Sequence, residues 1–450
     1  MIPNIFKAYD IRGLVGTELT KQFAFSTGVA FAKFLELERE PATVVIGEDM
    51  RPSSPELAEA FSAGVTSQGL DVIRIGLAST DMLYFAAGKL NLPGAMFTAS
   101  HNPAEYNGIK LCLSGARPIG KESGLLTIEK FVREGVPVSL RPIGIENHRE
   151  MLQDYVDHLL TLVDVSAIRK LNVVVDAGNG MAGHTAPAVF SRMNVEVTQM
   201  YYELDGTFPN HEANPIDEAN LADLKEMVKK KKADIGLAFD GDADRCFLVD
   251  EKGNAVNPSL LTALIADREL QKKPGSPIIY NLISSRAVKE VVQENGGKPL
   301  RSRVGHSFIK AMMAESGAIF GGEHSGHFYF ADFWRADSGM LAALHAIAAL
   351  GTSEKTLSEL LAPYARYFAS GEINSKVSDS KLIMAGIKES YGSKPGITTD
   401  QLDGLTVEGD TWWFNVRASN TEPLLRLNVE AKTKAQMEAL RDEVLAVIRG

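Results

Sequence analysis

Short apolar runs alternate with longer amphipathic stretches along most of the chain, a pattern that is typical of α/β architecture. In the first part of the sequence we expect strands at Thr43–Ile46, Val72–Ile75 and Gly94–Thr98. The stretch Ser54–Gln68, between the first two strands, has the length and spacing of a helix. These elements predict a first α/β unit that covers residues 1–145.

A second α/β unit is expected over residues 146–252. It begins with an amphipathic helix at Met151–Val163 and continues with a strand at Leu171–Asp176. Two further strands, Ile235–Phe239 and Cys246–Asp250, flank a short acidic loop near the end of the unit. The acidic loop is thus bordered closely by a strand on each side.

A third unit is expected over residues 253–364, where a helix at Leu260–Leu270 leads into a strand at Ile278–Leu282. The repeated rhythm of strand and helix suggests that the first three units are related, although the sequence contains no clear internal repeat.

The last unit, expected over residues 365–450, has a different pattern. A polar stretch at Lys388–Gln401 precedes two strand candidates, Thr411–Arg417 and Leu424–Ala431, and a helix at Lys434–Ile448 ends the chain. This unit is therefore set apart from the three α/β units.

Composition agrees with several domains, because 450 residues exceed the size of one ordinary hydrophobic core. The formal net charge of −10 argues against sequence-independent nucleic-acid binding, which needs basic surface, but it allows a small anionic ligand. No apolar stretch approaches the length of a membrane span. Cys112 and Cys246 both lie in apolar runs, as buried thiols of a reducing compartment do, so we expect a cytoplasmic protein.

The acidic loop of the second unit carries three aspartates, Asp240, Asp242 and Asp244. In extended backbone alternate side chains share a face, so the three carboxylates can converge. Such carboxylates repel one another unless a cation lies among them, and ligation by oxygen alone suits Mg²⁺. The loop is therefore a candidate magnesium site.

The sequence of this loop also allows two interpretations other than a magnesium site. One is a solvated acidic turn. The other is a calcium loop, because Glu251 follows Asp240 at nearly the required spacing. The calcium interpretation fails, since Arg245 stands where that loop needs glycine and the flanking segments are strands rather than helices.

A turn at Thr98–Pro103 follows an apolar strand and ends in proline, so we expect it to be exposed with the Ser100 hydroxyl at its tip. The adjacent His101 suggests a serine hydrolase. However, neighbouring side chains rarely point at each other as that mechanism requires, and the Gly-x-Ser-x-Gly elbow is absent. Taken alone, the segment is more often a structural turn.

Several segments resemble motifs of the α-D-phosphohexomutase superfamily, in its bacterial phosphomannomutase/phosphoglucomutase branch. Thr98–Pro103 is similar to the phosphoserine loop of that family, and Asp240–Arg245 is similar to its metal loop. Gly322–His327 and Arg417–Pro423 resemble two further motifs in the right order, and Lys7–Gly13 is typical of the family's start. The resemblance spans the whole chain. It implies four domains around a central cleft, three related α/β units with mixed sheets and a smaller C-terminal α+β domain.

The resemblance also implies a reaction, the reversible conversion of hexose 1-phosphates and hexose 6-phosphates, with mannose, glucose or both as the sugar. A phosphate on Ser100 would pass to the sugar and return through a bound 1,6-bisphosphate, which also acts as activator. The implied metal ligands for Mg²⁺ are Ser100, Asp240, Asp242 and Asp244. The implied catalytic residues are Ser100, Lys110, Arg245, His306 and Arg12. The implied substrate-binding residues are Glu323, Ser325, His327, Arg417, Ser419, Asn420, Thr421 and Tyr9.

The expected partners are small-molecule sugar phosphates, with neither nucleic acid nor membrane, and the expected state is a monomer or weak dimer. Without the resemblance, Lys110 would be taken for an ordinary surface lysine and His306 for a structural residue.

Three other features of the sequence lie outside these motifs. Gly178–Gly183 fits the dinucleotide pattern Gly-x-Gly-x-x-Gly, which is weak by itself, and we interpret it as a backbone turn. The run Lys229–Lys232 is interpreted as a solvated helix end. Where these mutases commonly place a substrate lysine, the stretch Asn281–Arg286 has none, and Arg286 is shifted from that place.

Two other functions stay open at the level of sequence. Water could discharge a phosphate from Ser100, which would make the protein a phosphatase. The loop Asp240–Asp242 also looks like the Asp-x-Asp loop of haloacid-type phosphatases, but that interpretation leaves the serine and sugar motifs unexplained. A phosphosugar-binding protein without activity is the third hypothesis, although it would not need an intact nucleophile and three aspartates.

Overall fold

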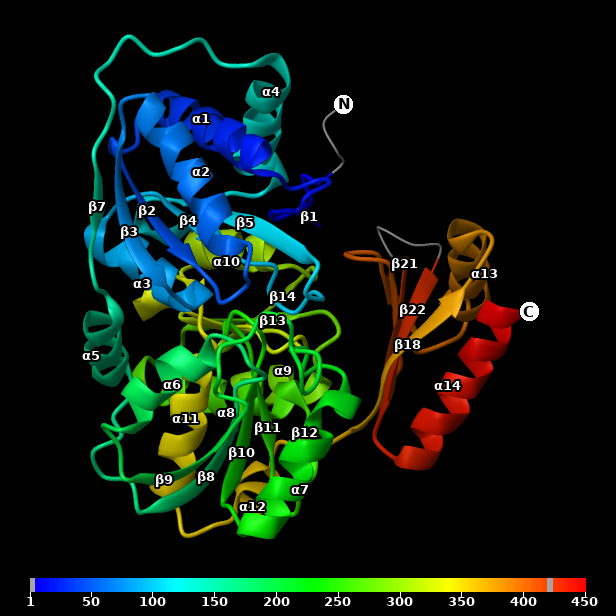
Figure 1. Ribbon diagram of the computed structural model, residues 1–450. Coiled ribbons are helices and arrows are strands. Elements are labelled where there is room, and N and C mark those ends of the chain that lie inside the picture. Colours follow the sequence, from blue (N-terminus) through cyan, green and yellow to red (C-terminus); the bar gives the residue numbers. More distant parts are fainter. Residues whose placement is uncertain (1–4, 419–423) are drawn as a thin grey trace.

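Four sheets organise the chain, each at the centre of its own unit (Figure 1). The computed structural model describes residues 5–418 and 424–450, and it leaves the side chains of residues 306 and 307 undescribed. In the view of Figure 1 the first unit lies above the second and third, and the C-terminal unit stands beside them.

The first unit is a mixed sheet with helices on both faces. Its elements are β1 (Ile11–Leu14), α1 (Lys21–Glu38), β2 (Thr43–Glu48), α2 (Ser54–Ser67), β3 (Asp71–Leu77), α3 (Thr80–Leu90), β4 (Gly94–Phe97), β5 (Tyr106–Leu113), β6 (Arg117–Pro118), α4 (Leu126–Glu134) and β7 (Glu146–His148). The strand order is β1-β5-β4-β2-β3-β7, with β6 paired to β5. Strands β4, β2, β3 and β7 are parallel, and β5 is antiparallel to β4 and β1.

Helices α1 and α2 pack unusually closely because each has a glycine at the crossing. A Cβ atom on Gly28 would lie 2.2 Å from the Phe61 carbonyl oxygen, and one on Gly64 would lie 2.2 Å from the Phe25 carbonyl oxygen. Helix α1 begins after Thr20, whose side chain accepts a hydrogen bond from the Phe23 N–H. The two helices therefore cover one face of the sheet as a single layer.

The second unit is a smaller mixed sheet. Its elements are α5 (Leu152–Leu162), β8 (Leu171–Asp176), α6 (Ala182–Phe190), β9 (Val195–Met200), α7 (Ala222–Lys231), β10 (Ile235–Phe239), β11 (Cys246–Val249) and β12 (Ala255–Val256). The strand order is β12-β11-β10-β8-β9. Strand β10 is parallel to β8 and antiparallel to β11, so the acidic loop is the hairpin that joins β10 to β11.

The third unit again has a mixed sheet, in the order β14-β13-β15-β16-β17. Its elements are α8 (Pro258–Lys272), β13 (Pro277–Asn281), α9 (Arg286–Glu294), β14 (Lys298–Ser302), α10 (His306–Ser316), β15 (Phe320–Gly322), β16 (Phe328–Phe330), β17 (Ala336–Asp337), α11 (Gly339–Gly351) and α12 (Leu357–Leu361).

The C-terminal unit has an antiparallel sheet with its helices, in the order β18-β22-β21-β20-β19. Its elements are β18 (Phe368–Lys376), α13 (Ser380–Gly392), β19 (Thr398–Asp400), β20 (Leu405–Glu408), β21 (Trp412–Ala418), β22 (Leu424–Ala431) and α14 (Lys434–Arg449). The fold class expected above is therefore confirmed, with three α/β units that have mixed sheets and a smaller α+β unit.

One continuous apolar core joins the first three units. It runs from Phe85 on α3 through Tyr155 on α5 and Phe239 on β10 to Phe328 on β16. The C-terminal unit has a separate core around Phe414. The first three units therefore form one packed body, to which the fourth is attached. Within the described part of the chain, no helix is both long and apolar enough to cross a bilayer.

Candidate active site

Ser100 lies in the loop between β4 and β5, at the junction of the first and second units. The expectation that its hydroxyl would be exposed is wrong, because the residue is only 5% exposed and faces the acidic loop. Its Oγ donates a hydrogen bond to Asp240 Oδ2 at 2.9 Å. Its backbone has a positive φ of 51°, which is uncommon for a residue other than glycine.

The imidazole of His101 points at the Ser100 hydroxyl, although adjacent side chains were not expected to do so. Its Nδ1 atom is 3.1 Å from Ser100 Oγ. The charge of Arg245 and then burial lower the pKa of this imidazole well below its ordinary value, so the ring is neutral near pH 7.

The three aspartates converge in the hairpin between β10 and β11. Asp240, Asp242 and Asp244 are all buried, and each offers a carboxylate oxygen within 4.8 Å of the others. Burial, together with the charges of the other two carboxylates, raises the pKa of Asp240 to about 7, although Arg245 opposes this shift. Three ionised carboxylates this close repel one another unless cations lie nearby.

The carboxylates fit a magnesium ion in their donor chemistry. Among the described residues, Asp242 Oδ1 and Asp244 Oδ1 are buried without a hydrogen-bond partner. Buried carboxylate oxygens without partners are what a hard divalent cation needs, because it binds oxygen ligands. A second possible cluster shares Asp244 with His327 and Asp337.

Two cationic side chains face this acidic loop. Lys110 of β5 is 8% exposed, so it is not a surface lysine, and its Nζ lies 2.6 Å from Asp242 and 2.7 Å from Asp244. Burial lowers the pKa of Lys110, but the two carboxylates outweigh it and hold that pKa well above its ordinary value. Arg245 donates from Nε to Asp240 Oδ2 at 2.7 Å, while its Nη2 has no partner among the described residues.

The candidates of the Gly322–His327 motif lie in the loop between β15 and β16, directly beside the acidic loop. Residues Arg245 and His327 pair as an isolated β-bridge, so the two loops are in backbone contact. His327 Nδ1 lies 3.0 Å from Asp337 Oδ2 and 3.7 Å from Asp244 Oδ1. Burial alone would lower the pKa of His327, but these carboxylates raise it above its ordinary value.

Glu323 of the same loop is 2% exposed and is held by several donors. Its Oε2 accepts a hydrogen bond from the Tyr329 hydroxyl at 2.7 Å, and its Oε1 accepts one from the Gly305 N–H at 3.2 Å. Ser325 is half-buried in the same loop. Burial and then Arg417 lower the pKa of His324 to about 3, which keeps this imidazole neutral.

Two candidates near the N-terminus, Arg12 and Tyr9, belong to the first unit. Arg12 of β1 donates to Asn102 Oδ1 in the serine loop and pairs with Asp10. Tyr9 donates to the Val304 carbonyl oxygen at 3.4 Å, so it touches the segment that leads to His306. Burial, more than the nearby Glu323 and Asp403, raises the pKa of Tyr9.

The C-terminal candidates are described only in part. Arg417, at the end of β21, lies 3.4 Å from Glu372 and 3.7 Å from Asp403. The predicted phosphate-binding residues Ser419, Asn420 and Thr421 lie outside the described residues, as does the side chain of His306.

Some residues of the site had no signal in the sequence. Thr80, the first residue of α3, donates from Oγ1 to Asp242 Oδ2 at 2.6 Å, and its N–H donates to the Asp242 carbonyl oxygen. Asp337 of β17 holds His327. Thr80 reaches the site through packing of the first unit against the second, and Asp337 reaches His327 from β17, which pairs with β16.

The stretch that lacks the expected lysine is used for packing between units. Ile283 is 7% exposed and packs in a small apolar cluster with Leu282 and Trp413. The guanidinium of Arg286 donates to the carbonyl oxygens of Gly409 and Asp410. Both residues therefore join the third unit to the fourth.

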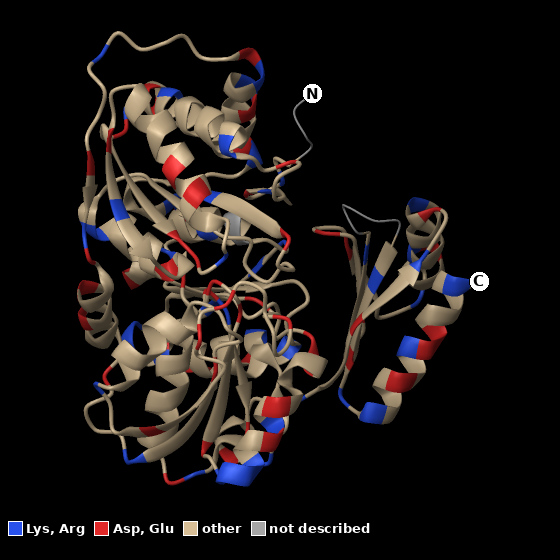
Figure 2. Ribbon diagram, in the orientation of Figure 1, with Lys and Arg blue, Asp and Glu red and all other residues tan. Residues whose placement is uncertain are grey.

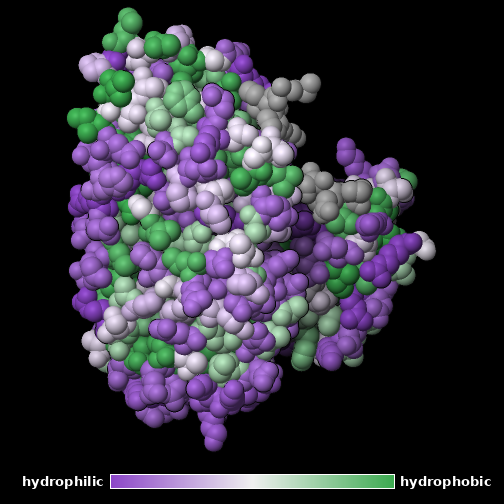
Figure 3. Space-filling model, in the orientation of Figure 1, coloured by the Kyte–Doolittle hydropathy of each residue, from purple (hydrophilic) through white to green (hydrophobic). Residues whose placement is uncertain are grey.

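A cleft separates the packed body from the C-terminal unit. Figure 3 shows this hollow, which is largely lined by hydrophilic surface. A cavity of about 670 Å³ lies there, bordered by the second, third and fourth units through Ile216, Ile283, His324 and Glu430. Charged segments of both signs also gather where the loops of the first three units meet (Figure 2).

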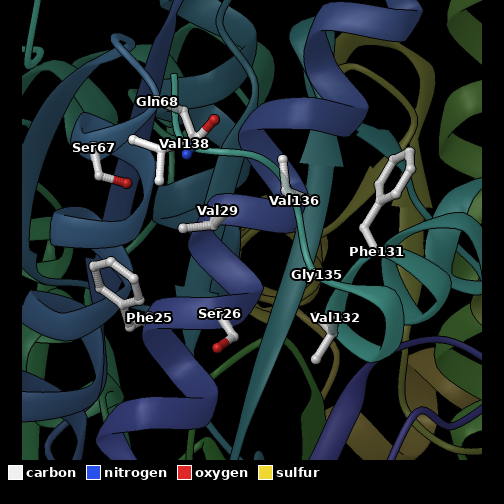
Figure 4. A pocket seen from close by; sticks show the side chains of 10 residues that line it. All are labelled: Phe25, Ser26, Val29, Ser67, Gln68, Phe131, Val132, Gly135, Val136 and Val138. Atoms are coloured by element: carbon white, nitrogen blue, oxygen red, sulfur yellow. The ribbon is translucent and has the colours of Figure 1, made fainter. Parts of the chain in front are cut away.

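Another cavity, of about 310 Å³, lies far from this chemistry in the first unit (Figure 4). It is bordered by α1, the end of α2 and the segment after α4, with apolar side chains such as Phe25, Val29 and Phe131. Its ten lining residues include no ionisable side chain, so it does not fit phosphoryl transfer.

Comparisons with known proteins agree along the whole chain. Family models described as phosphoglucomutase/phosphomannomutase alpha/beta/alpha domains I, II and III and C-terminal domain match residues 3–136, 153–253, 257–367 and 372–447. The chain is 40% identical over 436 residues to a phosphomannomutase of Vibrio cholerae, covering 95% of this chain and 94% of that one. It is 37% identical to a phosphoglucomutase of Neisseria gonorrhoeae, covering 99% and 96%.

A solved structure gives the same result. The crystal structure of a phosphoglucomutase/phosphomannomutase family protein from Burkholderia thailandensis superposes with a TM-score of 0.91 at 32% identity, covering 100% of this chain and 98% of that one. The chain therefore belongs to the phosphoglucomutase/phosphomannomutase family of the α-D-phosphohexomutase superfamily.

Proposed function

We propose that this protein is a phosphomannomutase/phosphoglucomutase that works through a phosphoserine at Ser100. The observation that carries the proposal is the hydrogen bond between Ser100 Oγ and Asp240, which places the hydroxyl beside three converging carboxylates. The relatives bear the names phosphomannomutase and phosphoglucomutase, which are isomerases of hexose phosphates. The reaction is the interconversion of hexose 1-phosphate and hexose 6-phosphate.

The reaction consists of two phosphoryl transfers. In the first, the bond between phosphorus and Ser100 Oγ breaks, a bond from phosphorus to the free sugar hydroxyl oxygen forms, and the proton of that hydroxyl is passed to Ser100 Oγ. After the bisphosphate has turned over, the bond between its other phosphorus and the sugar oxygen breaks, a bond to Ser100 Oγ forms, and the proton of Ser100 is passed to that sugar oxygen. Such transfers depend on positioning and on electrostatic stabilisation of the moving charge.

The residues around Ser100 would divide this work. Asp240, Asp242 and Asp244, with an oxygen on Ser100, would hold Mg²⁺, which supplies positive charge to the transferring phosphate. Arg245 would steady the same phosphate through its free Nη2, and Arg12 would approach it beside Asn102.

The remaining candidates would serve proton transfer and the sugar. Lys110 and His306 would handle protons in the two half-reactions, and His327 would bind substrate. Glu323 and Ser325 would bind sugar hydroxyls. The phosphate that is not reacting would be bound by Arg417, Ser419, Asn420 and Thr421. Tyr9 would contact the substrate.

Four further properties belong to the same proposal. A hexose 1,6-bisphosphate would activate the enzyme by phosphorylating Ser100. Sugar phosphates would be its partners, it would act as a monomer or weak dimer, and it would reside in the cytoplasm. Sedimentation at micromolar concentration would test the oligomeric state.

A coupled assay tests the function. The enzyme would receive mannose 1-phosphate or glucose 1-phosphate with Mg²⁺ and a trace of glucose 1,6-bisphosphate, and formation of the 6-phosphate would be followed. We expect turnover, and we expect both EDTA and Ser100→Ala to abolish it. The control Ser26→Ala, at a half-buried serine of α1, should leave turnover unchanged. Release of inorganic phosphate would instead indicate a phosphatase. Binding without turnover would indicate a phosphosugar-binding protein.

A further inference from the structure

The side chain of Arg51 holds four carbonyl groups of the serine loop. Arg51 lies between β2 and α2 and is 1% exposed. Its Nη1 donates to the carbonyl oxygens of Pro103 at 2.8 Å and Tyr106 at 2.9 Å. Its Nη2 donates to those of Ser100 at 3.0 Å and Asn102 at 2.7 Å. One guanidinium therefore fixes the backbone from the nucleophile to the start of β5.

The guanidinium of Arg51 is itself held by a buried carboxylate. Asp49, also fully buried, lies 3.3 Å from Arg51 Nε. The other oxygen of Asp49 accepts hydrogen bonds from the Arg51 N–H at 3.0 Å and from Ser54 Oγ at 2.6 Å. The planar group is thus held in one orientation, and its donors are directed at the loop.

The second unit closes over Arg51 from the other side. The ring of Phe208 lies over the guanidinium, with 5.1 Å between the ring centroid and the guanidinium carbon. A Cβ atom on Gly206 would lie 2.6 Å from the Arg51 Cα atom, so this loop rests directly on the arginine. With little access for water, the N–H groups of Arg51 depend on the carbonyl groups for their hydrogen bonds.

The conformation of Ser100 needs such support. Its φ of 51° is strained for a residue with a side chain, and its N–H donates to Thr98 Oγ1 at 2.9 Å. Its carbonyl oxygen lies between Arg51 and the acidic loop, since a Cβ atom on Gly241 would lie 2.3 Å from it. Contacts on both sides of the peptide therefore determine where the hydroxyl lies.

We propose that Arg51 is a positioning residue for the phosphoserine, which it holds in the left-handed conformation that places Ser100 Oγ on the acidic loop. The inference rests on the proposed mutase function and adds a residue that acts through the backbone of the serine loop, because both of its Nη atoms donate to carbonyl oxygens. Lysine cannot replace it, because one ammonium group cannot span four carbonyl oxygens in the plane of a guanidinium.

The test compares Arg51→Lys with Arg74→Lys. Arg74 is a matched control, because it is a buried arginine of the same unit, on β3, that pairs with Glu48 and does not contact the serine loop. We expect Arg51→Lys to lower kcat for glucose 1-phosphate about 100-fold with KM changed less than about threefold, since misplacement of a reacting group affects the chemical step. Arg74→Lys should change neither constant by more than about threefold.

A second readout does not depend on turnover. Amide hydrogen exchange of the peptide 98–106 should be about tenfold faster in Arg51→Lys and unchanged in Arg74→Lys, because only the first loses the carbonyl contacts. If the native protein shows no mutase activity, the proposed function fails and this exchange measurement still tests the positioning role.

A third variant covers the case in which Arg51→Lys does not fold. Phe208→Ala removes a half-buried ring over the guanidinium and should lower kcat about threefold to tenfold at constant KM, with faster exchange of the same peptide. Native exchange of the peptide 98–106 and native kcat in the variants that fold would overturn the proposal.

Discussion

The hydroxyl of Ser100 donates a hydrogen bond to Asp240, 2.9 Å away and 140 positions later in the sequence. The same carboxylate oxygen accepts from Arg245, so nucleophile, carboxylate and guanidinium form one connected group. Because the two loops belong to units that share a continuous core, this arrangement exists before substrate arrives. The remaining side of the cleft belongs to the C-terminal unit.

Arg417 is predicted to determine affinity for sugar phosphate. Its matched control is Arg426, which lies opposite it in register on β22 and also faces Glu372. Loss of one charge-assisted contact to phosphate costs about 2 kcal/mol, so Arg417→Ala should raise KM about 30-fold with a smaller change in kcat. Arg426→Ala should leave KM within about threefold. Equal effects of the two substitutions in the coupled assay would contradict the prediction.

The C-terminal unit is predicted to close over the substrate. It has its own core and borders a cleft, and a bisphosphate must be held yet allowed to turn. We expect the radius of gyration from small-angle X-ray scattering to fall when glucose 1-phosphate is added at saturating concentration. Inactive Ser100→Ala should show the same change, because closure precedes transfer. An unchanged radius in both proteins would argue against closure.

Ile283 is predicted to stabilise the position of the C-terminal unit through its contact with Trp413. Truncation of a buried isoleucine costs about 2 kcal/mol or more, so Ile283→Ala should raise KM about tenfold by loosening the contact. Ile216→Ala is the control, since that side chain borders the same cavity but is 43% exposed. If both variants keep the native KM, the apolar contact has no part in substrate binding.

Asp81 is predicted to make stability depend on pH. Its carboxylate accepts hydrogen bonds from Ser79, Tyr155 and Ser338, and burial raises its pKa from 3.8 to about 6 despite these donors. The folded protein therefore keeps a proton that the unfolded chain releases, so this group's contribution to stability falls as pH rises from about 4 to 6. The loss amounts to about 3 kcal/mol, at 1.36 kcal/mol for each pKa unit.

Thermal unfolding of Asp81→Asn between pH 4 and 7 checks this sign. The native protein should lose stability relative to the variant as pH rises through this window, whatever the offset caused by the altered hydrogen bonds. The exposed Asp332→Asn should show no such trend against the native protein. A difference between native and Asp81→Asn that is independent of pH would exclude the shifted carboxyl.

Local pattern was sufficient for the short apolar strands. Those predicted at Leu171–Asp176, Ile235–Phe239 and Leu424–Ala431 have the same bounds in the structure. The segment Ile235–Phe239 is a continuous apolar run, as strands buried on both faces are, whereas polar and apolar residues alternate in Leu424–Ala431. Helix α1 was not predicted, and its pattern is obscured by a largely apolar sequence with Gly28 at a helix crossing. Helix α13 and strand β19 cover part of the stretch that was recognised only as polar.

The site was predictable only where its residues form local motifs. The spacing of Asp240, Asp242 and Asp244 shows that they can converge, whereas nothing near Asp337 indicates its contact with His327, ten positions away. The contact of Thr80 with Asp242 spans 162 positions, so it depends on how the first and second units pack. The predicted exposure of Ser100 was wrong for the same reason, because the second unit covers its loop.

The separate cores of the packed body and the C-terminal unit have an evolutionary consequence. Substitutions on strands β18 to β22 are expected to alter how tightly the non-reacting phosphate is held without disturbing the packing that aligns Ser100 with its aspartates. Selection can then act on substrate affinity and on the chemical step almost independently, since distant sites with separate packing contribute additively. A protein built in this way can adjust its affinity while its phosphoryl-transfer centre is inherited unchanged.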